Sequence, residues 1–310
     1  MRVSSSTINN MATNSMSNSY KTYMDIMNKI ASNKNFTKVS QNVPDATKVL
    51  KLNDQLAQMD LYQNNIQAAT NEMDLAYDAL GAIIDEISSI NALVVEASNA
   101  TTTPDSAHAI ATEIEQRIAS IVDKMNTKYL DNYIFAGTYI QEPAYVIEGD
   151  DVKYQGSSEN AGERKLTISQ DTTFTYNFTG EEIFGKQDPA DVDENGVQND
   201  FFSQMKDLIT HLRQDTIDQN KIRGKITHLK SAIDNVTLVQ GDVSAKVSKL
   251  DTTKTINEDA ILKLTEDKVD LEEIDITKAA TDLANAQTAL QASYAIGTTI
   301  LGSVSLLDYL

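Results

Sequence analysis

The chain has 310 residues, with 26 Lys and Arg against 45 Asp and Glu, so its formal net charge is −19. An acidic surface repels phosphate backbones and anionic lipid, so we expect neither nucleic acid nor a membrane as a partner. The chain has no Cys, which excludes a disulfide framework, a thiolate metal site and a cysteine nucleophile. Trp is absent and aromatic residues make up 6% of the chain, which favours long thin helices over a large enclosed core.

Neither a targeting segment nor a membrane span is visible in the sequence. Residues 3–10 contain no apolar run followed by a cleavage site, so we expect no cleaved signal. The most apolar stretch, residues 283–307, contains Asn, Gln, Ser and Thr and is too polar for a span of about 20 apolar residues.

After Asp45, apolar residues recur at spacings of three and four, which predicts one long helix of some 50 residues. One seam position is apolar in seven successive heptads: Leu52, Met59, Ile66, Met73, Leu80, Ile87 and Val94. The other seam position includes the polar residues Gln63, Thr70 and Asn91. These polar residues favour a loose helical bundle over a tight two-stranded coiled coil.

A second helix is predicted to begin at Thr103-Pro104-Asp105, with Thr as the N-cap and Pro at the first helical position. The helical spacing continues to about Tyr133. Because the connection is short, we expect this helix to fold back antiparallel on the first.

The composition changes between Gly137 and Gly196, which enclose seven of the twelve glycines. Alternating apolar runs here predict strands, and Gly149-Asp150-Asp151 predicts a hairpin turn. The runs are Tyr145-Val146-Ile147, Val152-Lys153-Tyr154, Leu166-Thr167-Ile168 and Phe174-Thr175-Tyr176-Asn177-Phe178. Helical spacing resumes at Phe201, and a second long seam runs from Ile222 to Leu271. Beyond Leu271 the apolar positions shift, which predicts a helix that changes its buried face.

These patterns predict a mainly α fold, in which N- and C-terminal segments form an elongated antiparallel bundle that carries a small β-rich domain. We assign residues 1–44 and 272–310 to terminal assembly helices, with at least the N-terminal one disordered in the monomer. Residues 45–137 and 199–271 form the helical rod, and residues 138–198 form the small β-rich outer domain.

Both ends of the chain lack charge. Residues 3–20 carry no charged side chain, and 12 of these 18 residues are Ser, Thr or Asn. Residues 283–307 are also without charge, whereas the whole chain is 23% charged. A helix without charge on any side is typical of one surrounded by protein, because an unpaired buried charge is costly.

We therefore predict that the N-terminal segment is disordered alone and becomes ordered when chains assemble. The alternative is a mobile N-terminus beside a C-terminal helix that closes the monomer's own core. The predicted assembly contacts are Ile8, Met11, Tyr20, Tyr23, Met27, Leu283, Leu290, Tyr294, Ile300, Leu301, Val304 and Leu307.

Several motifs resemble those of the flagellar hook-associated protein 3 family, which belongs to the flagellin-like superfamily. The first three, in chain order, are Met1-Arg2-Val3-Ser4, Tyr133-Ile134-Phe135-Ala136-Gly137 and Gly180-Glu181-Glu182-Ile183-Phe184-Gly185. The C-terminal signature is Asp275-Ile276-Thr277-Lys278-Ala279-Ala280-Thr281-Asp282-Leu283, Ala289-Leu290-Gln291-Ala292-Ser293-Tyr294 and Ser305-Leu306-Leu307-Asp308-Tyr309-Leu310. One departure lies near the end of the first helix, where Asn33 stands in place of the family's Gly and the acidic pair before Pro44 is missing. Asn tolerates a positive φ, so the turn can persist.

The resemblance implies a structural protein of the bacterial flagellum that joins the hook to the filament. It implies export by the flagellar type III system to the cell exterior without signal cleavage. The implied partners are the other hook-associated junction protein, flagellin, further copies of itself in a ring, and an export chaperone on the C-terminal helix. It implies neither enzymatic activity nor a cofactor.

The clearest chemical motif is Asp191-Val192-Asp193-Glu194-Asn195-Gly196, which matches the first half of a calcium loop. Asp191, Asp193 and Asn195 are the candidate ligands, but Phe202 occupies the twelfth position, where a bidentate Glu is required. The alternative is a solvated turn. The three His residues, His108, His211 and His228, lie in helical stretches without metal-ligand spacing, and we interpret them as packing or surface residues.

Three other functions remain as alternatives. A flagellin-type filament subunit is the nearest, although the opening residues and the single small insert favour the junction protein. A secreted protein could carry a binding or catalytic site in residues 138–198, but this segment has no His or Cys. A pore-forming translocator would need an apolar span.

Overall fold

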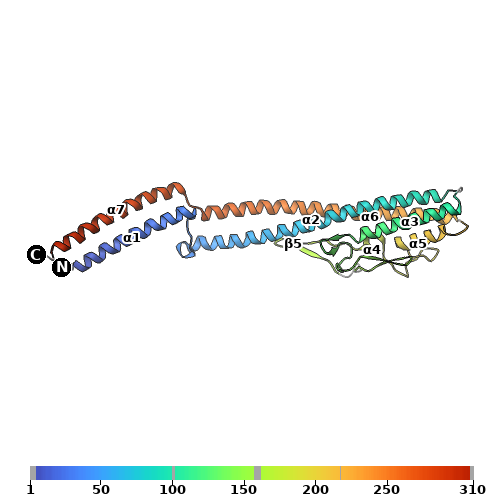
Figure 1. Cartoon of the computed structure of the whole chain (residues 1–310), viewed down its shortest axis with the longest axis horizontal. Helices are drawn as coiled ribbons and strands as arrows, with labels where there is room; N and C mark the ends of the chain where they lie inside the picture. The colour runs from blue at the N-terminus through green and yellow to red at the C-terminus, as the bar shows by residue number, and fades with distance from the viewer. Residues whose placement is uncertain (1–4, 100–101, 157–161, 217, 308–310) are drawn as a thin grey trace. The chain divides into compact units, whose positions relative to one another are not determined.

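The computed structural model describes residues 5–99, 102–156, 162–216 and 218–307, with only the backbone described at residues 5, 6, 8 and 300–307. A mainly helical fold with a small β-rich insert is confirmed (Figure 1). The helices are α1 (Ser5–Ser32), η1 (Val39–Gln41, a 3-10 turn), α2 (Val43–Ala97), α3 (Pro104–Met125), α4 (Gly180–Phe184), α5 (Phe201–Leu212), α6 (Gln219–Glu272) and α7 (Ile276–Leu307). The strands are β1 (Lys128–Tyr129), β2 (Asn132–Tyr133), β3 (Tyr145–Glu148), β4 (Asp151–Tyr154), β5 (Lys165–Ser169) and β6 (Thr172–Thr175).

The chain divides into two compact units. The terminal unit comprises Met1–Gln58 and Asp259–Leu310, and the central unit comprises Met59–Glu258. Helices α2 and α6 contribute a segment to each unit. No helix among the described residues combines the length and the apolar character that crossing a membrane requires.

The predicted long helix is present as α2. In the central unit its seam residues Ile66, Met73, Leu80, Ile87 and Val94 are almost completely buried. The polar seam positions leave buried oxygens unsatisfied, because Gln63 Oε1 and Asn91 Oδ1 have no hydrogen-bond partner. The amide nitrogen of Gln63 donates to the carbonyl of Lys254 on α6 at 3.3 Å.

Helix α3 begins as predicted, with the Thr103 hydroxyl accepting a hydrogen bond from the Ser106 N–H at 3.3 Å. The prediction that it continues to about Tyr133 is wrong, since it ends at Met125. The side chain of Asn126, just past that end, bonds to both backbone groups of Tyr145. Leu130 then adopts φ = +54°, and the chain forms the tight β1–β2 hairpin in place of another helical turn.

The predicted strand runs form the β3–β4 and β5–β6 hairpins, both antiparallel. In β3–β4, Glu148 pairs with Asp151, so the turn residues are Gly149 and Asp150, and Gly149 has φ = +65°. The run at Phe174 is shorter than predicted, because β6 ends at Thr175. Beyond it, the Asn177 side-chain oxygen accepts a hydrogen bond from the Arg164 N–H at 3.0 Å and closes the hairpin base.

Charged side chains hold β5–β6 against the helices. Arg164 donates to the mostly buried Glu72 of α2 at 2.9 Å and lies over the Tyr176 ring at 4.4 Å. Burial raises the pKa of Glu72, and the charge of Arg164 opposes that rise. The Lys246 ammonium of α6 lies 4.1 Å from the centre of the Phe178 ring. These contacts add to the apolar cluster in which Ile168, Phe174 and Phe178 are buried together with residues of the helices.

A buried polar network joins α5 to α6. The Lys225 ammonium, 5% exposed as a residue, donates to Gln204 Oε1 at 2.7 Å and lies 2.6 Å from Asp207 Oδ2. The Gln204 amide in turn donates to Asp193 Oδ2 at 3.2 Å. Lys225 thereby links both helices to the loop that precedes α5.

The prediction of one C-terminal helix with a changing buried face is wrong, because α6 ends at Glu272 and α7 begins at Ile276. The Asp275 carboxylate caps the new helix, accepting hydrogen bonds from the N–H groups of Thr277 at 2.9 Å and Lys278 at 3.1 Å. The shifted apolar period therefore reflects a second helix with its own register.

Candidate assembly surface

Helices α1 and α7 lie side by side in the terminal unit and run antiparallel (Figure 1). Helix α1 ends in a Schellman turn, in which the Lys34 N–H donates to the Lys29 carbonyl and the Asn33 N–H to the Ile30 carbonyl. Asn33 has φ = +54°, as expected for Asn at the place of a Gly.

The chain after this turn pairs with the end of α6. Lys34 forms an ion pair with Glu272, and the Asn35 N–H donates to the Glu272 carbonyl at 2.7 Å. Phe36 packs with Ala46 and Val49 in a small apolar cluster beside Leu271. These contacts fix the point where α1 and α7 begin to run together.

Small residues occupy the most buried positions of the contact between the two helices. On α7, Ala279, Ala286 and Gly297 are buried. A Cβ added to Gly297 would lie 3.3 Å from Met16 Sδ, so Gly297 lies level with Met16. The inner positions of α1 are half-buried at Ala12, Met16, Ser19, Tyr23, Ile26 and Ile30, and those of α7 at Leu283, Leu290 and Ser293.

The two sides of this helix pair differ in charge. The two helices carry five charged residues, and four of them precede an inner position by one residue: Asp25, Lys29, Lys278 and Asp282. The exposed apolar residues Tyr20, Met24, Met27 and Tyr294 instead follow an inner position by one residue. In an antiparallel pair, positions that follow the inner ones lie on the same side of the contact on both helices. Tyr20, Met24, Met27 and Tyr294 therefore form one side, which we call the uncharged flank.

The register brings the aromatic residues of this flank together. Because Met16 lies level with Gly297, antiparallel pairing brings Tyr20 level with residues 293–294. Tyr20 is 51% exposed and Tyr294 is 46% exposed. The uncharged flank thus has two exposed tyrosines at the same level, one on each helix, and two exposed methionines further along α1.

The twelve predicted assembly residues fall into four groups. Tyr20, Met27 and Tyr294 lie on the uncharged flank, and Met11, 67% exposed, lies on the opposite side. Tyr23, Leu283 and Leu290 point toward the helix–helix contact and are half-buried. The side chains of Ile8, Ile300, Leu301, Val304 and Leu307 lie outside the described residues. Sequence reasoning missed Met24 and Ile296, although helical spacing from Tyr20 and Tyr23 could have revealed Met24.

The calcium-loop motif forms a turn closed by the chain itself. Asp193 Oδ1 accepts hydrogen bonds from the N–H groups of Asn195 at 2.8 Å and Val197 at 3.0 Å, and Asp191 Oδ1 accepts one from the Asn199 amide at 2.7 Å. Burial raises the pKa of Asp193, but hydrogen bonds from Val197, Gln204 and Asn195, together with the charge of Lys225, outweigh it and lower the pKa. Phe202, at the twelfth position, is buried in an aromatic cluster. Within the described part of the chain, no group of three or more His, Asp or Glu residues is arranged to hold a metal.

The three His residues have different surroundings. His108 Nε2 lies 3.1 Å from the Arg213 carbonyl, and His211 Nε2 lies 3.5 Å from Asp207 Oδ1. His228 is half-buried on α6. Burial and the nearby Lys225 charge lower the pKa of His228, and Asp193 opposes them.

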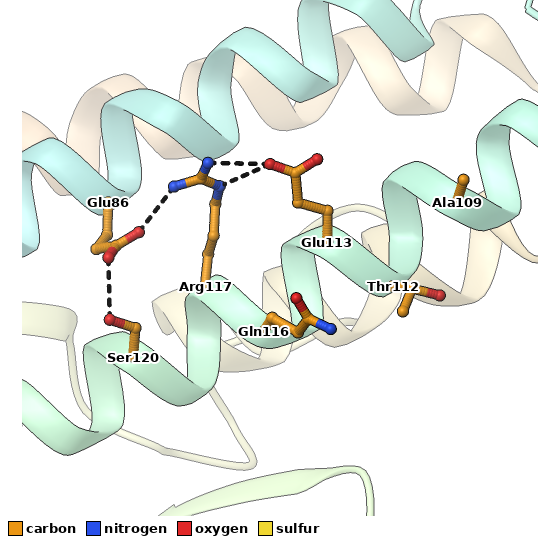
Figure 2. A pocket seen from close by; sticks show the side chains of 7 residues that line it. All are labelled: Glu86, Ala109, Thr112, Glu113, Gln116, Arg117 and Ser120. Carbon is orange, nitrogen blue, oxygen red and sulfur yellow. Dashed lines mark hydrogen bonds and ion pairs between the residues drawn. The ribbon is translucent and has the colours of Figure 1, made fainter.

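A polar hollow of about 510 Å³ between α2 and α3 is a second candidate site (Figure 2). Its Arg117 donates to Glu86 at 3.0 Å and to Glu113 at 2.9 Å, and the Ser120 hydroxyl donates to Glu86 at 2.9 Å. Every charged residue lining this hollow is thus already paired. This pairing favours a role in holding α2 and α3 together over a role in binding a ligand.

Comparisons with known proteins agree with this architecture. The family model for the bacterial flagellin N-terminal helical region matches residues 3–139. A search of curated proteins by sequence gives no match.

Three solved structures share the fold. The first is described as a flagellar hook-associated protein from Vibrio parahaemolyticus, with a TM-score of 0.65, 18% identity, and coverage of 75% of this chain and 100% of that one. Hook-associated protein 3 from Legionella pneumophila has a TM-score of 0.62 at 15% identity, covering 72% and 98%. The flagellar junction protein FlgL from Legionella pneumophila has a TM-score of 0.56 at 15% identity, covering 72% and 99%. The resemblance predicted from the sequence motifs is confirmed in the fold.

Proposed function

We propose that this chain is a structural junction protein of the bacterial flagellum that links the hook to the filament. The observation that carries the proposal is the uncharged flank of the α1–α7 pair, on a fold similar to hook-associated proteins. A helix pair with one side free of charge is suited to burying that side against protein. The chain acts by packing, without catalysis or a cofactor.

Each predicted domain has its own role in the proposed assembly. Residues 1–44 and 272–310 make the axial contacts, residues 45–137 and 199–271 form the rod, and residues 138–198 form the outer domain. An axial assembly requires that one surface of each copy meets a different surface of the next, so that the contacts do not close on themselves.

The expected partners follow from this position. They are the other hook-associated junction protein on one side, flagellin on the other, and further copies of this chain in a ring. We also propose that an export chaperone covers α7, where Tyr294 and Ile296 are exposed, during secretion without a cleaved signal. The mature location is then the external flagellum.

The decisive experiment uses a strain that lacks this gene. Its hooks are imaged by electron microscopy, and flagellin is assayed in the medium. Bare hooks with shed monomeric flagellin are expected, because export continues while polymerisation has no base. A complemented strain is the control and should regain filaments. Normal filaments in the deletion strain, with no second copy of the gene, would overturn the proposal.

A filament subunit is the second candidate, and the match to the flagellin N-terminal helical region is compatible with it as well as with a junction protein. The same experiment separates the two functions. A filament subunit predicts bare hooks with no flagellin in the medium, because the deleted chain would itself be the flagellin.

The proposed ordering of the N-terminus on assembly has its own test. Removal of residues 1–30 from the purified monomer should leave the helical circular dichroism signal unchanged if this segment is disordered in the free chain. A loss equivalent to residues 5–30, which are 26 of the 28 residues of α1, would instead mean that α1 and α7 are already paired in the monomer.

A further inference from the structure

Leu130 combines two unfavourable features at one position. It is 79% exposed, the largest exposure among the large apolar side chains described. It also adopts φ = +54° in the β1–β2 turn, a conformation that favours Gly and Asn over Leu. Neither hydration nor backbone geometry explains a leucine at this position, and such strain is typical of functional sites.

The hairpin that carries Leu130 is firmly held. The Tyr129 hydroxyl accepts a hydrogen bond from the Asn71 amide of α2 at 3.3 Å, and the Tyr133 N–H donates to the Ile140 carbonyl at 2.9 Å. The Lys128 ammonium lies 4.4 Å from the centre of the Tyr133 ring. The turn therefore presents Leu130 as a fixed apolar projection.

Elsewhere in the central unit, α3, α5 and the β3–β4 hairpin enclose a hollow of about 440 Å³. Its apolar lining includes Ile118, Ile147, Val152, Phe202 and Ile209. Ile147 is 47% exposed there. The charged residues at the edge are largely paired, since Arg213 binds Glu115 at 2.8 Å and Lys206 binds Asp151. The hollow thus offers an apolar surface with little unpaired charge around it.

We propose that Leu130 of one copy inserts into the α3–α5 hollow of a neighbouring copy. An apolar projection and an apolar hollow at different places on one chain form a head-to-tail contact, which generates a ring or a helical array. This inference rests on the proposed function, because the junction ring is the assembly that needs such a contact. Burial in the hollow removes the exposed leucine from water and accounts for the strained turn.

Cysteine cross-linking tests the contact directly, because the chain has no Cys of its own. A strain whose only copy of the gene carries Leu130→Cys and Ile147→Cys is grown, and its flagella are isolated and treated with a bismaleimide. The expected result is a ladder of cross-linked dimers, trimers and higher species. Each single variant should give at least tenfold less cross-linked product. The matched control pairs Leu130→Cys with Leu238→Cys, since Leu238 is 72% exposed but lies outside the hollow. An absent ladder, or an equal ladder from this control, overturns the contact.

A second variant decides the matter if the double cysteine chain does not assemble. Leu130→Asn suits the positive φ of the turn, so the purified monomer should melt at or above the wild-type temperature. The same variant should reduce the number of hooks with filaments about tenfold and increase shed flagellin. Wild-type filament numbers from Leu130→Asn would overturn the contact while leaving the junction function intact. Normal filaments in the gene-deletion strain would overturn the junction function itself.

Discussion

The terminal helix pair and the central unit use their helices in opposite ways. In the central unit, α2 buries large residues such as Ile66, Ile87 and Val94 with no exposed surface. In the α1–α7 pair, no described side chain of α1 is buried, and among the described positions of α7 only Ala279, Ala286 and Gly297 are buried. The central unit thus buries its apolar surface within the chain, whereas the terminal pair leaves its apolar side chains available to other chains.

This difference shows that similar apolar spacing leads to deep burial in the central unit and to shallow burial in the α1–α7 pair. A seam of Ile, Leu and Met stabilises the monomer through apolar burial. The α1–α7 contact buries small residues and leaves its larger inner residues, such as Tyr23 and Leu290, half-buried, so it removes less apolar surface from water. The predictions below test this contrast.

The largest effect is expected from a cavity in the central seam. Ile87→Ala on α2 should lower the free energy of unfolding by about 2–5 kcal/mol, because Ile87 is fully buried. Met24→Ala on the uncharged flank is the matched control and should change it by less than about 0.5 kcal/mol. Urea unfolding of the two purified variants measures both values. Equal losses would remove the contrast between the two regions.

Substitution of the buried Lys225 should cause the next largest loss of folding stability. Lys225→Met leaves the Asp207 carboxylate without this partner, with an expected loss of about 3 kcal/mol. The double variant Lys225→Met with Asp207→Leu should recover most of that loss, because both charges are then gone. Thermal melting of the single and double variants gives the comparison. A double variant as unstable as the single one would mean that packing around Lys225, and not its charge, is what matters.

A charge on the uncharged flank should affect assembly and spare the monomer. Tyr20→Asp should reduce the fraction of hooks with filaments about tenfold, which corresponds to about 1.4 kcal/mol for an interface that buries an unpaired charge. Lys21→Asp, at the neighbouring outward position, should retain most assembly. Both chains should melt at the wild-type temperature. The assignment of the flank fails if the two variants assemble equally.

Substitutions at Asn33, in the turn that ends α1, should destabilise the chain according to how poorly the new residue tolerates a positive φ. Asn33 has φ = +54°, so Asn33→Ala should cost about 1 kcal/mol and Asn33→Gly should cost much less. Hydrogen exchange at residues 29–35, compared between the two variants, locates the effect in this turn. Equal exchange in both variants would argue against a strained turn.

The smallest effect should come from His228. Its pKa is lowered in the folded chain, so the unfolded chain binds more protons just below pH 6.5, and stability falls as the pH drops through that region. His228→Gln should flatten the decrease in melting temperature between pH 7.5 and pH 5.5. An identical pH profile for the variant and the wild-type chain would rule out this source of pH dependence.

Much of the architecture could be predicted because its signals are local. The heptads of α2 and α6, the Thr103 cap and the turn at Gly149 each depend on residues a few positions apart. The sequence also contained a signal for the break at 273–275, since Asp is a preferred N-cap residue and Asp275 stands just before the first residue of α7. It was missed because the apolar spacing continues across the break with only a change of register.

The rest depends on pairing that a single sequence does not encode locally. The end of α3 at Met125 depends on Asn126 binding Tyr145, which lies 19 residues away. The uncharged flank becomes visible only when the antiparallel register of α1 and α7 is known. The hollow that faces Ile147 requires α3, α5 and a hairpin to come together, and no motif marks it.

The pairing of α2 with α6 also determines the order in which this chain becomes folded. The hydrogen bond from Gln63 to Lys254 joins residues 191 positions apart, and the Lys34–Glu272 pair spans 238 positions. Contacts of such separation raise the contact order and delay the closing of the core. Any process that delivers the chain from its N-terminus therefore leaves the part of α2 that faces α6 uncovered until the 191 residues after Gln63 have followed. During that interval the first half of the molecule exposes apolar surface that favours aggregation.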